Sequence, residues 1–437
     1  MMRVRFENFR CFTSSPMVEI RPLALLIGEN SAGKTSFLAG MRFLFESMSG
    51  TARDVFNRDP YYLGGFQEIA YSRIRGRPAS SFVMQIELTA EEVCHQFRFV
   101  RGEPQPELSS YEFSSAGDRM VAEFMSREPS ISLHLKDVPE GDRNITISNA
   151  ERSLPPLSYI KNNPTYLFMM FDYVMYRSEV TKGRRAKAGV SAAVADRMRL
   201  LKERFRVSTT YLNKSVFASA PVRTQPHRTY TPSEVAVSSE GDQVPLELAR
   251  AKLRSPERWS EVQKGLSAFG RDSGLFTNVD VRQFGKSDID PFQVLVRVGS
   301  ARRNLVGVGY GVSQILPIVF QLQNPGSNNV FLLQQPEVHL HPRAQAELGS
   351  LIADKHQQSP EHIYIVETHS DYIIDRLRIL ISMGILNPDH VGLVFFQKRG
   401  HDCIGSNIYF NRRGELLDVP DNFRSFFIEE HSRLLGF

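Results

Sequence analysis

The sequence is poor in the features that mark secreted, metal-bound or membrane-spanning proteins. It has three cysteines, Cys11, Cys94 and Cys403, which lie far apart and form no C-x-x-C pair. So small and odd a number argues against a disulfide framework and against a zinc site. No apolar run approaches the roughly 18 residues that a transmembrane helix needs, and the first residues lack the apolar stretch of a secretory signal. We therefore expect a cytoplasmic protein without a membrane partner.

The rest of the composition is that of a globular protein. The chain has 437 residues, of which 41% are hydrophobic and 23% are charged, which is ordinary for this class. At roughly 100–200 residues per domain, two or three units are expected. The residue patterns predict a strand-rich N-terminal lobe at 1–150, a mainly helical basic insertion at 151–235, and a C-terminal half at 236–437. Together they predict an α/β fold.

Hydrophobic periodicity supplies the individual elements. Short alternating or β-branched runs predict strands at 4–9, 18–28, 81–89, 96–101, 131–136 and 144–148. Apolar residues at helical spacing predict a helix at Thr35–Ser47 and a second one with the stripe Val190, Val194, Met198, Leu201 and Phe205. Prolines interrupt Ala220–Pro232, which should be extended. After this segment, a further helical stretch is expected, followed by strands near 292–298.

Positive charge is concentrated in the insertion. The chain has a net charge of +5, whereas Lys182–Arg206 alone has nine basic residues and two acids, for a net charge of +7. A solvated helix face explains such a run, and so does binding of nucleic acid or of an acidic partner. Both interpretations stay open at this point.

The first chemical motif is Gly28-Glu29-Asn30-Ser31-Ala32-Gly33-Lys34-Thr35, which fits G-x-x-x-x-G-K-[ST] throughout. We call it the phosphate loop. In such a loop, backbone N–H groups surround phosphate oxygens, the lysine reaches the β- and γ-phosphates, and the final hydroxyl binds Mg²⁺. A buried-strand run, Leu23–Ile27, comes directly before it and a helix directly after, so the pattern predicts a site for ATP and Mg²⁺.

Three further segments lie in the C-terminal half. The glycine turn, Gly307–Gln314, runs into an apolar helix expected at Ile315–Leu322. The Gln-Pro-Glu segment, Gln334–Pro342, follows the apolar strand Val330–Leu333. The Thr-His-Ser segment, Glu367–Asp371, follows the apolar strand Tyr364–Val366. Because a parallel sheet presents its ligand-binding groups at the carboxyl ends of its strands, these segments predict the second half of the nucleotide site.

The order of these parts resembles the ABC-type ATPases of the SMC, RecF and OLD group. The sequence is most similar to stand-alone AAA ATPases of the DUF3696 type, several of which accompany bacterial anti-phage systems. Phe6-Glu7-Asn8-Phe9-Arg10 resembles the N-terminal "F-x-N-F" strand of the group, and Pro221 to Tyr230 resembles its "P-x-R…P-x-R-x-Y" segment.

The resemblance implies a function and a set of roles. The protein would bind Mg²⁺-ATP, form a homodimer or higher oligomer around it, and control a separate effector protein such as a nuclease or toxin. The glycine turn would contact the γ-phosphate held by the opposite protomer. His369 would lie beside that phosphate, Glu337–His341 would cross the dimer interface, and Gln67 is a weak candidate for sensing Mg²⁺. The expected nucleotide-binding residues are Gly28, Asn30, Ser31, Ala32, Gly33, Lys34, Thr35, Ser36, Gly309, Gly311, Ser313 and Gln314.

One departure from the group concerns the residues after Val330–Leu333. An acid that holds Mg²⁺ and often a second that activates water are expected there, but the chain has Gln334 and Gln335, which we call the amide pair. A neutral amide is a poorer ligand for Mg²⁺ than a carboxylate and a poor general base. Hydrolysis could be slow, an engineered Glu→Gln trap could be present, or Glu337 or Glu367 could supply the charge. The catalytic candidates are therefore Gln334, Gln335, Glu337 and His369, and the metal candidates are Thr35, Gln67 and Gln334.

Other residues have two interpretations. His339 and His341 beside Glu337 suggest a metal site, but their spacing is weak evidence for one. Arg223 and Arg228 fit either a structural ion pair or a contact near the nucleotide or a partner. Asp371 is expected to cap the helix Tyr372–Ile381.

Rival functions make different predictions. A transporter subunit would carry an L-S-G-G-Q signature, which the chain lacks. A DNA repair or maintenance ATPase of RecF or SMC type stays an alternative, as does a scaffold that binds ATP without hydrolysing it. An OLD-type nuclease would add a Toprim domain, whose acidic motifs we do not find after His369.

Overall fold

The computed structural model describes residues 1–49, 56–72, 76–125, 130–138, 144–148, 192–223, 225–232, 240–287, 289–324, 326, 328–420 and 423. These residues form two compact units, each assembled from separate segments of the chain. The first comprises Met1–Ile20, Asn30–Val216 and Gln397–Gly405, and the second comprises Arg21–Glu29, Phe217–Phe396 and Ser406–Phe437. The units are therefore discontinuous, whereas the three parts expected from the sequence follow one another along the chain.

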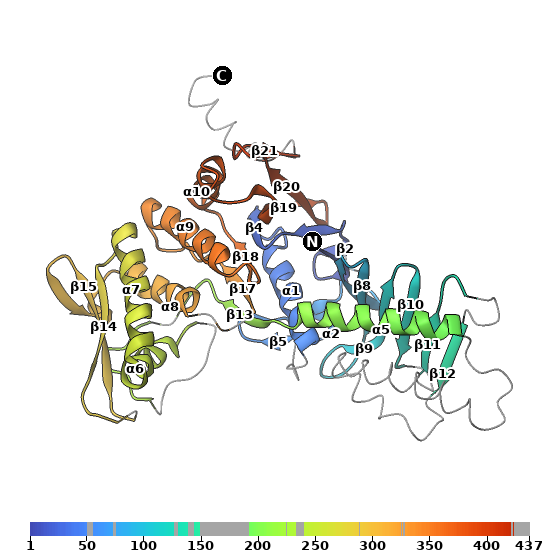
Figure 1. The fold of residues 1–437 in the computed structure, drawn as a ribbon, viewed down its shortest axis with the longest axis horizontal. Helices are drawn as coiled ribbons and strands as arrows, with labels where there is room; N and C mark the ends of the chain where they lie inside the picture. Colours follow the sequence, from blue (N-terminus) through green and yellow to red (C-terminus); the bar gives the residue numbers. More distant parts are fainter. Residues whose placement is uncertain are drawn as a thin grey trace. The chain divides into compact units, whose positions relative to one another are not determined.

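The first unit is built on an antiparallel sheet whose order is β12-β11-β10-β9-β8-β7-β1-β2, with β3 also paired to β1 (Figure 1). Its strands are β1 (Met2–Phe9), β2 (Phe12–Ser14), β3 (Val18–Ile20), β7 (Ser81–Leu88), β8 (Val93–Val100), β9 (Glu107–Ser115), β10 (Asp118–Glu123), β11 (Ser130–His134) and β12 (Asn144–Ser148). A small hairpin of β5 (Asn57–Arg58) and β6 (Tyr61–Tyr62) and the short helix α2 (Phe66–Ile69) complete its N-terminal part.

Helix α1 (Lys34–Ser49) lies almost wholly buried in the first unit. Phe37 and Phe43 on this helix contact phenylalanine rings of the sheet, such as Phe6 and Phe97, at 5.3 and 5.9 Å between centroids. Burial of such rings is the main favourable term in a core of this kind. The helix that begins with Lys34 is therefore held rigidly.

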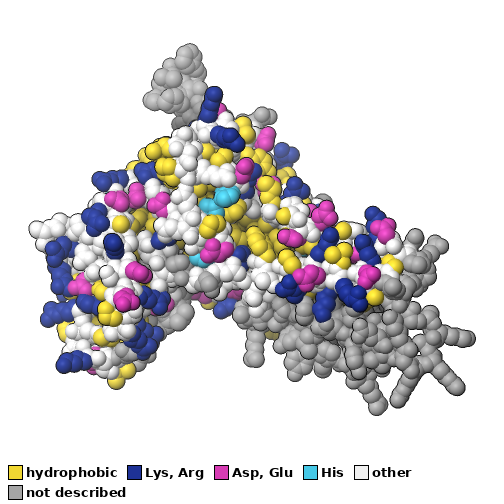
Figure 2. All heavy atoms as spheres, viewed as in Figure 1, with side chains coloured by type: hydrophobic (Ala, Val, Ile, Leu, Met, Phe, Trp, Pro, Cys, Tyr) yellow, Lys and Arg dark blue, Asp and Glu magenta, His cyan; other side chains and the backbone are white. Residues whose placement is uncertain are grey.

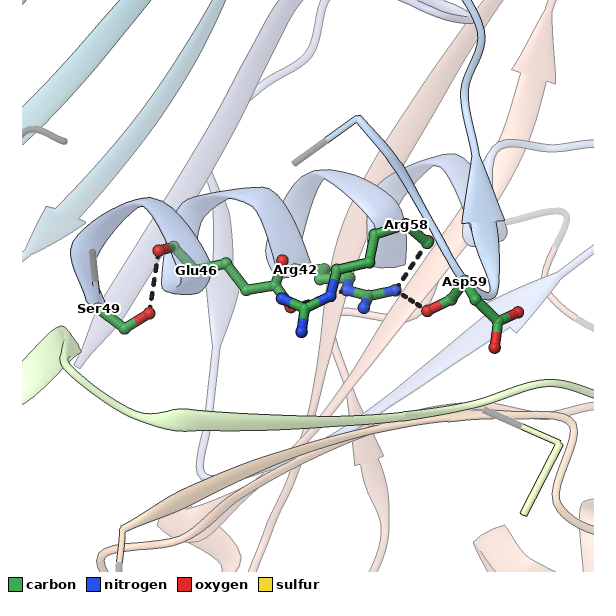
Figure 3. A network of polar contacts seen from close by, with 5 residues as sticks. All are labelled: Arg42, Glu46, Ser49, Arg58 and Asp59. Carbon is green, nitrogen blue, oxygen red and sulfur yellow. Dashed lines mark hydrogen bonds and ion pairs between the residues drawn. The ribbon is translucent and has the colours of Figure 1, made fainter. Parts of the chain in front are cut away.

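A polar network fixes the second half of α1 (Figure 3). The Nε of Arg42 donates to Glu46 at 3.0 Å, and its Nη1 donates to the carbonyl of Arg58 at 2.9 Å. Arg58 contacts the same Glu46 carboxylate at 3.2 Å. Because Arg42 and Glu46 are both buried, the pair joins the β5–β6 hairpin to α1 away from water.

Helix α5 (Ala192–Leu212) lies along strands of the first unit's sheet, as Figure 1 shows. The described part of the predicted stripe, Val194, Met198, Leu201 and Phe205, is buried as expected. His95 on β8 lies between the Tyr111 hydroxyl at 2.6 Å and the Ser208 hydroxyl at 2.9 Å. Burial lowers the pKa of His95 to about 3, so the imidazole is a neutral link between the sheet and α5.

The second unit contains parallel strands with helices packed around them. Strands β17 (Asn329–Gln334), β18 (Ile363–Glu367), β4 (Leu23–Gly28) and β19 (Val391–Arg399) are neighbours in this order and run parallel. Strand β13 (Ser215–Ser219) lies beside β17, and β20 (Asp402–Phe410) and β21 (Leu416–Leu417) follow β19. The α/β prediction is confirmed.

The helices of this unit are α6 (Val244–Arg254), α7 (Pro256–Ser273), α8 (Tyr310–Gln323), α9 (Pro342–Gln358) and α10 (Asp371–Ser382), with short 3₁₀ turns at Leu305–Gly307 and Pro388–His390. Helix α7 packs against α6, α8 and α9 and against the antiparallel sheet of β14 (Asn278–Gln283), β15 (Phe292–Val298) and β16 (Ala301–Asn304). The buried apolar side chains of these elements form one continuous core.

Several predicted boundaries were wrong. The single strand expected at 18–28 is two strands, β3 and β4, in different sheets, because Arg21-Pro22 interrupts it. Strands β9 and β10 were not predicted. Helix α8 begins at Tyr310, five residues before the expected start. The stretch 220–232, expected to be extended, contains no α-helix among its described residues, but residues 221–222 and 228–229 are bends and Pro232 is in a 3₁₀ turn. Tyr230 forms a bridge to Phe292.

Candidate nucleotide site

The phosphate loop connects the end of β4 with the start of α1, as predicted. Gly28 and Gly33 have φ angles of 132° and 99°, and Ser31 has a φ of 59°. A Cβ on Gly28 would lie 2.0 Å from the carbonyl oxygen of Phe396, and one on Gly33 would lie 2.7 Å from the Sγ of Cys11. Only glycine combines these dihedral angles with so little space, so the two glycines of the motif are required by the backbone itself.

The residues between and after these glycines differ in exposure. Asn30, Ser31 and Thr35 are exposed, Ser36 is half-buried, and Ala32 is buried. The side chain of Lys34 is also buried, at 3% exposure. The loop thus presents backbone and a hydroxyl at the N-terminus of a helix, where N–H groups and the helix dipole favour an anion.

The ends of three parallel strands in the second unit align next to one another. Gln334 at the end of β17 is opposite Glu367 at the end of β18, and Glu367 is opposite Leu26 on β4. The Gln335 N–H donates to the Glu367 carbonyl at 2.8 Å, and the Thr368 N–H donates to the Leu26 carbonyl at 3.0 Å. The amide pair, the Thr-His-Ser segment and the strand that ends at Gly28 therefore share one edge of the sheet, as the sequence predicted.

The residues at this edge fit a triphosphate better than they fit its metal ion. The phosphate loop has the glycine geometry of an anion site, whereas Gln334 and Gln335, both half-buried, offer only neutral amides. Gln335 also has a φ of 43°, a strained angle for a residue with a side chain and one that is more frequent at functional sites. Of the metal candidates, Gln334 offers an amide oxygen in the second unit, and Thr35 and Gln67 offer a hydroxyl and an amide oxygen in the first unit.

Glu337 joins the Gln-Pro-Glu segment to the Thr-His-Ser segment. Its Oε1 accepts a hydrogen bond from the backbone N–H of His369 at 2.8 Å, and its Oε2 has no hydrogen-bond partner. The side chain is 6% exposed, and this burial raises the pKa of its carboxyl, although the His369 N–H and Arg223 act against the rise. A buried carboxylate thus fixes the backbone of His369.

Arg223 is buried beside this carboxylate. The amide of Gln314 accepts from the Arg223 N–H at 3.0 Å and donates to the Arg223 carbonyl at 3.2 Å. None of the three guanidinium nitrogens has a hydrogen-bond partner, and burial lowers the pKa of Arg223 to about 10. Gln314, expected from the sequence to contact nucleotide, is fully buried and uses its amide to hold Arg223. Arg228 lies exposed.

The glycine turn packs against the Gln-Pro-Glu segment. A Cβ on Gly311 would lie 2.6 Å from the His339 carbonyl oxygen, and the Tyr310 ring meets the His339 ring at 4.7 Å. Ser313 is 6% exposed and donates its hydroxyl to the Tyr310 carbonyl at 2.9 Å. A Cβ on Gly309 would meet no atom within 4 Å. The open part of the turn is therefore its glycine end and not Ser313.

The structure also describes the four remaining candidates, which are His341, His339, Gln67 and Asp371. His341 caps α9 through its ring nitrogen, which accepts from the Ala344 N–H, and His339 is exposed with a φ of 70°. Within the described residues, no group of three or more His, Cys, Asp or Glu side chains could hold a metal ion. Gln67 is exposed on α2. The cap of α10 is Ser370, whose Oγ accepts from the Ile373 N–H, so the prediction of Asp371 as cap was wrong.

The basic run Lys182–Arg206 is described only from residue 192 onward. Each arginine of α5 lies within 4.0 Å of a carboxylate: Arg197–Asp118, Arg199–Asp196, Arg204–Glu92 and Arg206–Glu203. Figure 2 shows basic and acidic side chains interspersed along the α5 side of the first unit. This arrangement is typical of a solvated helix face. Among the described helices, none is long and apolar enough to cross a membrane.

One known protein family matches a segment in the middle and C-terminal part of the chain. Residues 215–375 match the family described as "AAA domain, putative AbiEii toxin, Type IV TA system". This match spans the glycine turn and the Gln-Pro-Glu and Thr-His-Ser segments, but less than half of the chain. No curated protein matches the chain significantly.

Solved structures of SMC heads are similar over nearly the full length. An SMC head bound to the C-terminal winged-helix domain of ScpA shows 10% identity and a TM-score of 0.45, covering 94% of this chain and 98% of that one. The SMC head of Thermotoga maritima shows 10% identity and a TM-score of 0.37, covering 92% and 97%. Because these TM-scores lie below 0.5 and the identities below 25%, the likeness does not by itself assign a function.

Proposed function

We propose that this protein is an ATPase of ABC type that binds ATP with Mg²⁺ at the phosphate loop and hydrolyses it slowly. The observation that carries the proposal is the phosphate loop itself. Gly28 ends a buried parallel strand, Gly33 comes directly before the helix, and both have positive φ angles. A buried lysine, Lys34, begins the helix. The amide pair and His369 follow neighbouring strands of the same sheet.

Each group has a part in holding the triphosphate. The backbone of the phosphate loop would bind the phosphate oxygens, Lys34 would neutralise the β- and γ-phosphates, and Thr35 and Gln334 would supply oxygens to Mg²⁺. The bound Mg²⁺ would neutralise charge on the phosphates. Glu337 would hold the backbone of His369, so that the ring stays beside the γ-phosphate.

Slow turnover follows from the amide pair. Neither Gln334 nor Gln335 can accept a proton from water. Oε1 of Glu337 already accepts from the His369 N–H, and this side chain is only 6% exposed to water. Glu367 is the other carboxylate at this edge, and it is 3% exposed. The same observation favours one second candidate, a scaffold that binds ATP without hydrolysing it.

We further propose that ATP closes a homodimer through the glycine turn and that this state controls a separate effector. Gly307 and Gly309 have open space around their Cα atoms, as a surface that receives a second protomer requires. An effector that is a toxin or nuclease in bacterial anti-phage defence accords with the resemblance of the chain. The description of the matched family, which names a toxin–antitoxin system, accords with it as well.

Calorimetry on Lys34→Ala tests the nucleotide site. The parent should bind ATP, and the variant should lose binding by at least about a hundredfold because the phosphate charge is no longer neutralised. Lys264→Ala, which removes an exposed lysine on α7, should bind as the parent does. Equal ATP affinity in Lys34→Ala and parent would show that the site is wrongly assigned.

A further inference from the structure

Two of the three cysteines lie side by side in the first unit. Cys11 lies in the turn between β1 and β2, and Cys403 lies in β20. The backbone N–H of Cys403 donates to the Cys11 carbonyl at 2.9 Å. The Asp402 carboxylate accepts from the Thr13 N–H at 2.9 Å and from the Thr13 hydroxyl. These contacts hold the two backbone segments in one fixed register.

Both cysteine side chains converge on the phosphate loop. A methyl group at Gly33 would lie 2.7 Å from the Sγ of Cys11 and 3.3 Å from the Cβ of Cys403. The Phe12 ring fills the same space from 2.9 Å. The last glycine of the phosphate loop is therefore packed directly against the cysteine pair.

The geometry of the pair suits a disulfide. The Cys11 Sγ and the Cys403 Cβ both lie within 3.3 Å of one point, the position of a Cβ on Gly33. The two side chains are therefore neighbours, as a disulfide requires. The thiols already interact, since the hydrogen bond between them raises the pKa of Cys11 and lowers that of Cys403. The Cys403 sulfur is therefore the better nucleophile of the two.

We propose that Cys11 and Cys403 are a redox modification site, at which a hydroperoxide converts the two thiols to an intramolecular disulfide beside the phosphate loop. The Cys403 thiolate attacks one oxygen of hydrogen peroxide, the O–O bond breaks, and the hydroxide released takes a proton to become water. Cys11 then loses its proton and attacks the Cys403 sulfur, whose hydroxyl leaves with that proton as a second water. The two thiols supply the two electrons that the peroxide accepts.

The burial of the pair selects a small oxidant. Cys403 is 2% exposed and Cys11 is half-buried. At this exposure Cys403 is closed to a protein disulfide or a bulky thiol reagent, whereas hydrogen peroxide is little larger than water. The site should therefore respond to peroxide and resist larger thiol oxidants.

The expected effect of the disulfide on ATP binding rests on the proposed function. Disulfide formation changes the position of the Cys11 Sγ, which packs on Gly33 in the reduced form. Gly33 holds a φ of 99°, and this packing is part of what supports the loop. Oxidation should therefore weaken ATP binding by at least about threefold.

Mass spectrometry tests the modification without reference to nucleotide. After peroxide treatment, the parent should lose two hydrogen atoms in mass, and a peptide joining Cys11 to Cys403 should appear. Cys94→Ala should behave in the same way, because Cys94 lies on β8 with a pKa raised to about 11 by burial. Cys11→Ser and Cys403→Ala should each prevent the link. A parent that keeps both thiols, or that links another pair, would overturn the proposal.

Calorimetry on the same samples tests whether the disulfide changes the affinity for ATP. The oxidised parent should bind ATP at least about threefold more weakly than the reduced parent, and dithiothreitol should restore the affinity. A disulfide that forms without any change in affinity would overturn the link to the phosphate loop. If neither form binds ATP, the proposed function fails while the mass result still decides on the disulfide.

Discussion

Glu337 and Arg223 are opposite charges that lie buried near each other without a direct hydrogen bond. Each has polar atoms without a hydrogen-bond partner, namely Oε2 of Glu337 and the three guanidinium nitrogens of Arg223. Desolvation of two charges is expensive, and such arrangements persist mainly where function requires them. Because Glu337 also holds the His369 N–H, we infer that the pair positions His369.

The protonation of Glu337 should make the free energy of unfolding depend on pH. Burial raises the pKa of this carboxyl, so the folded protein binds the proton more tightly than the unfolded chain. The free energy of unfolding therefore falls as pH rises from the ordinary carboxyl pKa through the raised one. Burial also raises the pKa of Glu247, Glu347 and Asp354, so urea unfolding in steps from about pH 4 to 8 should show a steeper fall in the parent than in Glu337→Gln.

Arg223→Gln provides the second arm of this experiment. Arg223 lowers the pKa of Glu337, so its removal should extend the sloping part of the stability profile to higher pH. The double variant Arg223→Gln with Glu337→Gln should show the same pH dependence as Glu337→Gln alone. Parallel profiles for parent and Glu337→Gln would contradict the assignment of a buried, titrating carboxyl.

Residues with local signals could be predicted from the sequence, and residues whose partners are distant could not. The phosphate loop and the amide pair follow apolar strand runs, so their positions could be read directly. Gln314 could not, because it holds Arg223, 91 positions away, and no local pattern shows that contact. The contact between Cys11 and Cys403 could not be predicted for the same reason, because the two residues lie far apart in the sequence.

Helix α5 illustrates the same distinction at the scale of elements. Its apolar stripe is a local pattern and predicted the buried face correctly. Its charges left a binding surface open, but Arg197 pairs with Asp118 on β10 and Arg204 pairs with Glu92 in the turn before β8. The break between β3 and β4 had a local signal, the proline of Arg21-Pro22. The serine-rich strand β9 was missed because pairing in a sheet, and not local propensity, decided it.

Reversing the charge of single arginines on α5 tests which of them stabilise the fold. Arg197 contacts Asp118, whose side chain is 3% exposed, so Arg197→Glu should cost about 3 kcal/mol of stability by leaving two carboxylates together. Arg199→Glu should change stability by less than about 0.5 kcal/mol, since its partner is exposed. Thermal unfolding of the two variants compares these effects. Equal destabilisation would contradict the assigned roles.

Nucleic-acid binding by the Lys182–Arg206 run needs its own measurement. If the run neutralises phosphates, affinity for DNA or RNA should fall steeply with salt, and reversing Arg199 and Lys202 to Glu should weaken it without unfolding the protein. Fluorescence anisotropy with labelled oligonucleotides checks this. Equal binding by parent and variant, or binding by neither, would favour the solvated helix face.

At the scale of the whole molecule, the proposal requires two protomers to meet around ATP. Gly309 is the place to test this, because a Cβ there meets no atom within 4 Å and its φ of −57° suits any residue. Gly309→Arg should keep the fold and prevent the rise in mass that ATP causes in light scattering. Glu261→Arg, an exposed change on α7, should dimerise as the parent does. An unchanged ATP-dependent mass in Gly309→Arg would exclude this interface.

The most direct test of the account is the rate of ATP hydrolysis by Gln334→Glu. Gln334 ends β17 at the sheet edge, and the substitution restores a carboxylate of the same length where the metal ion needs one. We predict that the parent binds ATP and turns it over slowly, and that Gln334→Glu is faster by at least about tenfold, equivalent to about 1.4 kcal/mol of barrier. If the rate is unchanged while Glu337→Gln or Glu367→Gln abolishes hydrolysis, the catalytic acid lies elsewhere and this account of the site is contradicted.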